Sequence, residues 1–237
     1  MKRIIIYLSF ITVVFTRCTE IDYNEISVNK FSKKILVDAS HDGGGWWFPQ
    51  SGIYSANLPH QGKAFADLLK NRGFTVDELP SYTLITDSIL NQYDKVIRAG
   101  KYGNYQLSEL QAYDHLVNRG SSLFLISEYL VPGEIDQLSE RLGISFQGTY
   151  FGNVDSFSLH TITQGATPFY FNAGSIVMNA TTNPNIQVLG WLSGNSNLPV
   201  MGILKHSLSK VFFLGEINGI ETLPQPLTNN IIQWLFE

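Results

Sequence analysis

The chain has 237 residues, a formal net charge of −4 at pH 7 and 15% charged residues, against about 25% in an average soluble domain. Binding to a phosphate backbone requires a dense basic surface, so this composition excludes nucleic acid as a partner. The only cysteine is Cys18, and a disulfide framework or a zinc–thiolate site needs more than one.

The first eighteen residues have the pattern of a secretory signal peptide. Lys2 and Arg3 give a positive start, and residues 4–15 are almost entirely apolar. This run is shorter than the about 20 apolar residues that span a bilayer, but it matches the about 7–15 apolar residues of an export signal. A buried N-terminal strand is the alternative interpretation. We therefore expect an exported protein.

Cys18 follows the apolar run directly and resembles the cysteine that bacterial lipoproteins acylate at the start of the mature chain. Phe15 and Arg17 depart from the Leu-like and small residues preferred at those places. Because a free thiol in an exported protein would need its own explanation, we predict lipidation of Cys18. The protein would then lie in the periplasm or at the outer membrane, anchored by its lipid. Residues 19–32 would form a polar tether and residues 33–237 one domain.

The first half of the domain alternates short apolar runs with amphipathic segments. Short apolar runs rich in branched residues predict strands buried on both faces, and amphipathic segments that end at glycine predict helices. The expected strands cover residues 34–39, 74–79, 95–100 and 122–127, and the expected helices cover residues 60–73, 87–92, 107–118 and 134–142. This alternation is typical of a parallel sheet with helices on both faces.

After about residue 145, turn-rich pieces separate short strand-like runs. The expected strands are residues 158–163, 175–179, 186–192, 200–204 and 211–214, with a hairpin at residues 205–210 and a final helix at residues 227–236. No repeat or linker interrupts the sequence, so we expect a single α/β domain with a β-rich C-terminal part.

Three phrases occur in order along this domain. The first begins His60-Gln61-Gly62 and closes with Gly-Phe-x-Val-x-Glu-Leu at residues 73–79; the second is residues 159–165; the third is residues 211–216 followed by residues 229–235. Together they resemble the class I glutamine amidotransferase-like superfamily and, more narrowly, the exported bacterial DUF4350-like branch. The resemblance runs from residue 34 to the C-terminus. It implies a flavodoxin-like three-layer sandwich with a mostly parallel sheet.

The resemblance also shows what is missing for catalysis. Active members carry a cysteine on the turn after the central strand, and His and Glu after the closing strand. The matching segments here are Ser127-Glu128-Tyr129-Leu130 and Glu216-Ile217-Asn218. Glutamine hydrolysis through a thioester needs a thiolate and an adjacent base, so we expect no amidotransferase activity. Ser127 also lacks the Gly-x-Ser-x-Gly context of a serine hydrolase.

Ligands of doubly wound sheets bind beyond the carboxyl ends of the strands. Residues 41–50, 101–105, 127–129 and 216–218 should meet there. Glycines in the first segment permit close approach of a ligand, and the paired tryptophans either stack on a sugar or pack as a lid over the core. The expected ligand-binding residues are Gly43, Gly44, Trp46, Trp47, His60, Lys101 and Tyr102.

Four ionisable residues are the candidates for catalysis: His41, Asp42, Glu128 and Glu216. His41 and Asp42, together with His60, could form an acid/base group or two-thirds of a metal site. No His-x-x-x-His spacing points to a metal, and we expect no cofactor. The two glutamates are either ordinary loop carboxylates or the paired carboxylates of glycoside hydrolysis. Our leading hypothesis is a non-catalytic binding or assembly module for a carbohydrate or envelope component. A hydrolase of a saccharide or envelope substrate and a structural partner in an envelope complex are the alternatives.

Overall fold

A computed structural model describes residues 33–193 and 198–237. The predicted signal peptide, Cys18 and the tether lie outside the described residues. The strands in these residues are β1 (Lys34–Asp38), β2 (Thr75–Leu79), β3 (Lys95–Ala99), β4 (Ser122–Ile126), β5 (Phe146–Phe157), β6 (Phe169–Val177), β7 (Ile186–Leu192), β8 (Pro199–Lys205) and β9 (Lys210–Leu214). The helices are α1 (Lys63–Asn71), α2 (Asp87–Leu90), α3 (Leu107–Asn118), α4 (Gln137–Arg141), a short 3₁₀ helix η1 (Asn218–Glu221) and α5 (Gln225–Phe236).

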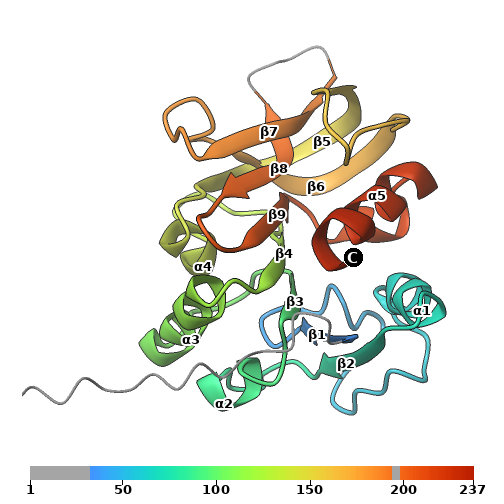
Figure 1. Cartoon of the computed structure of the whole chain (residues 1–237), viewed down its shortest axis with the longest axis vertical. Coiled ribbons are helices and arrows are strands. Elements are labelled where there is room, and N and C mark those ends of the chain that lie inside the picture. Colours follow the sequence, from blue (N-terminus) through green and yellow to red (C-terminus); the bar gives the residue numbers. More distant parts are fainter. Residues whose placement is uncertain (1–32, 194–197) are drawn as a thin grey trace, which may run out of the picture.

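All nine strands belong to one sheet with the order β2-β1-β3-β4-β9-β8-β7-β5-β6. Neighbours from β2 to β9 run parallel, and neighbours from β9 to β6 run antiparallel. Figure 1 shows the parallel strands in the lower part of the molecule and the antiparallel strands at the top. The sheet is therefore mixed, with strand β9 at the junction of its two halves.

The expected flavodoxin-like three-layer sandwich with a mostly parallel sheet is wrong. Four pairings of neighbouring strands are parallel and four are antiparallel, and strands contain more residues than helices. The described residues from β5 to β9 contain no helix. Parallel neighbours need a long crossover connection, whereas short turns between successive strands give antiparallel pairs. The fold is accordingly β-rich.

Residues 158–163 form turns, so the strand expected there is wrong. The Thr163 hydroxyl donates to the carbonyl of His160 at 3.1 Å, and the Ile162 N–H donates to Nδ1 of His160 at 3.1 Å. These local bonds compete with a strand ladder. The missed strand, β5, comes just before them and pairs with both β6 and β7.

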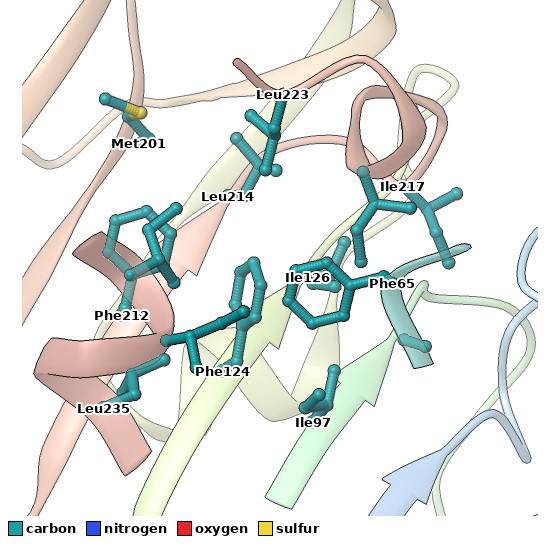
Figure 2. Close-up of a cluster of buried hydrophobic side chains, with 14 of the residues drawn as sticks. Phe65, Ile97, Phe124, Ile126, Met201, Phe212, Leu214, Ile217, Leu223 and Leu235 are labelled. Carbon is teal, nitrogen blue, oxygen red and sulfur yellow. The ribbon is translucent and has the colours of Figure 1, made fainter. Parts of the chain in front are cut away.

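The core lies on both sides of the parallel strands. Helices α1 and α5 bury their apolar faces in one cluster, and α2, α3 and α4 bury theirs in another. Figure 2 shows the first cluster, where Phe124 of β4 packs between Phe65 of α1 and Phe212 of β9. The ring centroid of Phe124 lies 6.1 Å from the ring centroid of Phe65 and 5.2 Å from that of Phe212. This packing fixes the strands whose carboxyl ends carry the site.

Candidate functional site

A cavity of about 480 Å³ opens beyond the carboxyl ends of β1, β3, β4 and β9. Its volume falls within the about 300–1,000 Å³ that is usual for ligand sites. The lining comes from residues 42–45 and Phe48 after β1, from residues 101–102 after β3, from Glu128, Tyr129, Val131 and Glu134 after β4, and from Asn218, with Gln61 at the approach to α1. Because these strands are parallel, their last residues lie at one edge of the sheet, and the four segments expected to meet do meet.

The carboxylate of Asp42 holds the glycine-containing loop after β1 in place. Its carboxylate accepts hydrogen bonds from the Gly44 N–H at 3.0 Å, the Ser81 hydroxyl at 2.7 Å and the Trp47 N–H at 3.1 Å. Gly43 and Gly44 have φ values of 63° and 87°, which favour glycine. A buried carboxylate with three donors positions the loop, and it is not free to act as a base.

Trp46 and Trp47 lie in the core, with 0% and 1% of their surface exposed. The indole N–H of Trp46 donates to Glu78 at 2.9 Å, and that of Trp47 donates to the Leu79 carbonyl at 3.0 Å. A Cβ on Gly62 would lie 2.2 Å from the Trp46 ring, so a glycine is needed beneath it. The tryptophans therefore form the lid over the core, and their faces are closed to a ligand.

His60 is also buried, next to the same two tryptophans. Its Nδ1 lies 3.2 Å from the Trp46 carbonyl oxygen, and its Nε2 lies 3.3 Å from Oε2 of Glu78. The cavity lining does not include it. The expectation that His60 contacts a ligand does not fit this position, because the ring is buried beside the tryptophans and does not line the cavity.

Three exposed aromatic rings surround the cavity instead. Phe48 is 65% exposed, Tyr102 59% and Tyr129 49%, and all three line the cavity. Sequence reasoning selected Tyr102 but missed Phe48 and Tyr129. The available signal was their position in segments that follow strands β1 and β4. Large exposed rings around a hollow are informative, because such rings are usually buried.

Polar side chains complete the lining. Lys101 is mostly buried, and its Nζ lies 3.4 Å from Oε2 of Glu134. Gln61 donates to Asn218 at 3.0 Å, and Asn218 donates to the Asn172 carbonyl at 3.0 Å. Lys101, a predicted ligand-binding residue, lies in the lining. Asn218 belongs to the segment 216–218 that was expected at the site, whereas Gln61 and Glu134 were not proposed as site residues. The cavity thus combines aromatic faces with a few fixed polar groups.

Glu128 and Glu216 lie near each other, one at the cavity and one behind it. Glu128 lines the cavity and accepts from the Tyr129 N–H at 2.9 Å. Burial raises its pKa to about 7, although backbone N–H groups of Tyr129 and Ile217 oppose the rise. Glu216 is fully buried. Burial and, to a smaller extent, the Glu128 charge raise the pKa of Glu216 to about 8.

The Glu216 carboxyl is tightly enclosed. Its Oε2 accepts from the Asn172 N–H at 2.6 Å, while its Oε1 has no hydrogen-bond partner among the described residues. A Cβ on Gly219 would lie 2.4 Å from Oε1, and a Cβ on Gly174 would lie 2.5 Å from the Glu216 Cβ. An unpartnered oxygen in such a place favours the protonated, neutral acid.

His41 does not line this cavity and faces a neighbouring one. Its Nδ1 donates to the Tyr102 carbonyl at 2.9 Å, and its Nε2 lies 3.2 Å from Oε1 of Glu109. Of the four catalytic candidates, His41 faces the other cavity, Asp42 is saturated with donors and Glu216 is enclosed. Glu128 is left as the acid that is open to the first cavity.

Ser127, the first residue after β4, is enclosed by a buried ion pair. Ser127 is fully buried, and its hydroxyl donates to Asp136 at 2.9 Å. Arg98, which is also fully buried, donates to Asp136 at 2.6 Å, to Ser139 at 3.0 Å and to the Gly100 carbonyl at 2.7 Å. Ser127 is therefore not presented as a nucleophile.

Within the described ranges, no group of three or more His, Cys, Asp or Glu side chains is placed to hold a metal ion. None of the helices in that part of the chain is long and apolar enough to cross a bilayer.

No family model and no curated protein matches the sequence, but solved structures share its fold. The mmIFT52 N-terminal domain superposes with a TM-score of 0.62 at 15% identity, over 85% of this chain and 96% of that domain. A ThuA-like protein from Bacteroides uniformis gives 0.58 at 15% identity, over 87% and 91%. A beta-galactosidase from Bacillus circulans gives 0.52 at 13% identity, over 86% of this chain but 31% of its own.

These similarities establish the fold and nothing finer. ThuA-like proteins have the class I glutamine amidotransferase-like fold, so this part of the resemblance is confirmed. The sequence identities are too low to transfer an activity, since one fold hosts many functions.

Proposed function

We propose that the domain is a non-catalytic module that binds a carbohydrate of the cell envelope, built on a class I glutamine amidotransferase-like scaffold. One observation carries this proposal: the exposed rings of Phe48, Tyr102 and Tyr129 surround a cavity that also contains fixed amide groups. Flat rings suit the faces of sugar rings, and a few placed polar groups suit hydroxyls. The net charge of −4 does not favour a phosphate-rich ligand.

The enclosure of Ser127 and Asp42 supports binding over catalysis. Ser127 stands where active relatives place a cysteine, and it is enclosed by the ion pair of Arg98 and Asp136. The carboxylate of Asp42 is occupied by hydrogen bonds from the loop that it holds in place. A site that exposes aromatic rings while Ser127 and Asp42 are engaged by the protein is suited to holding a ligand.

We extend the proposal to the cellular compartment of the protein, which would be the cell envelope. The charged start, the apolar run and Cys18 have the order of a lipoprotein leader, which would anchor the domain in the periplasm or at the outer membrane through residues 19–32. An exported domain of this kind would fit the DUF4350-like branch. The beta-galactosidase neighbour has this fold within a longer chain, an arrangement compatible with a role beside saccharides.

The test is binding to a panel of polysaccharides and soluble oligosaccharides, measured as a rise in melting temperature. We expect at least one saccharide to stabilise the wild type and not the Tyr129→Ala variant. Tyr170→Ala is the matched control, because Tyr170 is 53% exposed on β6 and does not line the cavity. Binding that survives Tyr129→Ala would contradict the proposal, as would a panel in which no saccharide binds.

A second candidate function, hydrolysis of a saccharide, is favoured by Glu128. A carboxyl with a pKa of about 7 is part protonated at neutral pH, as a general acid requires. If the bound saccharide is cleaved, Glu128→Gln should abolish cleavage and retain binding. Intact saccharide after prolonged incubation with the wild type would exclude hydrolysis and leave binding as the function.

A further inference from the structure

A second cavity of about 360 Å³ lies directly beside the first. Asp42, Gly43 and Tyr102 line both cavities. Because Tyr102 is 59% exposed, its ring forms a ridge that both hollows share. The two cavities are thus neighbouring parts of one surface.

The ridge is held rigidly. Gly43 has φ +63°, and a Cβ there would lie 3.0 Å from Cβ of Tyr102, so the glycine lets Tyr102 approach closely. The Tyr102 carbonyl accepts from His41, whose ring stacks on Tyr105 at 3.9 Å between centroids. The far side of His41 contacts the buried Glu109. A preorganised wall of this kind lowers the entropic cost of binding.

The second cavity has an exposed ring of its own. Tyr82 lines it and is 83% exposed. Its φ of 68° is unusual for a bulky residue, and such conformations cluster at functional sites. A backbone hydrogen bond from Tyr82 to the Ser40 carbonyl at 2.8 Å fixes this conformation. The backbone conformation from which this side chain projects is therefore fixed.

The remaining lining of the second cavity suits a neutral ligand with many hydroxyls. Ser81, Thr83, Asn104 and Gln106 contribute hydroxyl and amide groups. The ionisable side chains His41 and Glu109 contact each other, and Asp42 accepts three hydrogen bonds from the protein. None of the three therefore needs a charged ligand as a partner. Neutral donors and acceptors beside an aromatic ring repeat the chemistry of the first cavity.

We propose that the two cavities form one extended site, in which a linear saccharide of at least two units crosses the ridge at Tyr102. One unit occupies the first cavity near Phe48 and Tyr129, and the next lies beside Tyr82 in the second. This inference rests on the proposed carbohydrate-binding function and adds that the ligand is an oligomer.

The test measures affinity against ligand length. Calorimetric titration of the full chain uses β-1,4-linked N-acetylglucosamine oligomers of one to six units, which are neutral and soluble. We expect affinity to rise from the monomer to the short oligomers and then to level off. Tyr82→Ala should weaken binding of the tetramer about five- to tenfold, the value of one aromatic contact, and leave the monomer unchanged. Tyr82→Gly, which permits the observed φ, should behave in the same way, and Tyr170→Ala should have no effect.

The outcomes separate this inference from the function on which it rests. Equal affinity for all lengths, or equal weakening of monomer and tetramer by both Tyr82 variants, would overturn the extended site and leave single-unit binding in place. If no oligomer binds while other saccharides of the panel stabilise the wild type, this ligand class for the extended site is wrong. If no saccharide binds at all, the proposed function fails and the extended site fails with it.

Discussion

Glu216→Gln should remove a large part of the pH dependence of folding stability above pH 5. The Glu216 carboxyl is fully buried, accepts one backbone hydrogen bond through Oε2 and leaves Oε1 without a partner among the described residues. These conditions raise its pKa from 4.5 to about 8 in the folded protein. A Gln side chain has nearly the same shape, carries no charge and can still accept from the Asn172 N–H.

The sign and size follow from proton linkage. Between pH 4.5 and about 8 the folded protein holds a proton on Glu216 that the unfolded chain has released. The stabilising contribution is therefore complete below pH 4.5 and is lost as pH rises toward 8. A pKa rise of this size corresponds to on the order of 4 kcal/mol in the free energy of unfolding. Glu128 acts in the same direction, but less strongly, because it is partly exposed and screened by solvent.

Urea unfolding at pH 5 and at pH 8.5 measures this contribution. The wild type should lose more stability between the two pH values than Glu216→Gln, by on the order of 4 kcal/mol. Glu221→Gln, which changes an exposed carboxylate in η1, should keep the wild-type dependence. Equal slopes for the wild type and Glu216→Gln would refute the reasoning, and so would a variant less stable than the wild type at pH 8.5.

Two further substitutions test the framework of the cavity. Gly62→Ala would place a Cβ 2.2 Å from the buried Trp46 ring, so we expect a loss of about 1–3 kcal/mol from overpacking, measured by urea unfolding; wild-type stability would show that the ring can shift. Asp42→Ala removes the acceptor of three donors, so it should cost about 1–3 kcal/mol and weaken saccharide binding in calorimetry. Unchanged saccharide affinity in Asp42→Ala would mean that the conformation of the glycine-containing loop after β1 does not shape the site.

Local patterns predicted the elements of the parallel half well. Helix α3 has the expected bounds, since its apolar positions recur at helical spacing and Gln106 with Glu109 forms a capping box at its start. Strands β1, β3 and β4 are short apolar runs that are buried almost throughout. In these segments the local preference and the tertiary environment agree.

Strand β5 shows why the other half was harder to predict. Only Phe146 and Val154 of its twelve residues are buried, and its pairing with β6 shifts register between Gln147 and Phe151. A strand of this kind has no regular alternation of apolar and polar residues. Its formation depends on partners that are distant in sequence, so a local window cannot reveal it.

The place of the site was predictable, but its surface was not. The ends of parallel strands meet at one edge whatever their side chains, which is why residues 41–50 and 216–218 come together. Trp46, Trp47 and Phe48 are consecutive aromatic residues, yet the first two are buried and the third is exposed. Hydrogen bonds from the loop to Asp42 and the absence of a side chain at Gly62 set these directions. The first of these contacts spans only five residues within the loop, whereas the second joins the loop to the start of α1 and is tertiary.

The buried pair of Arg98 and Asp136 has a kinetic consequence. It ties β3 and the start of α4 to the turn after β4, while the Leu130 N–H bonds to the Gly148 carbonyl at 3.0 Å on the far side of that turn. The segment that carries Tyr129 is thus anchored at both ends before any ligand arrives. Association should accordingly follow a single exponential whose rate constant grows linearly with ligand concentration, without the plateau of a preceding isomerisation.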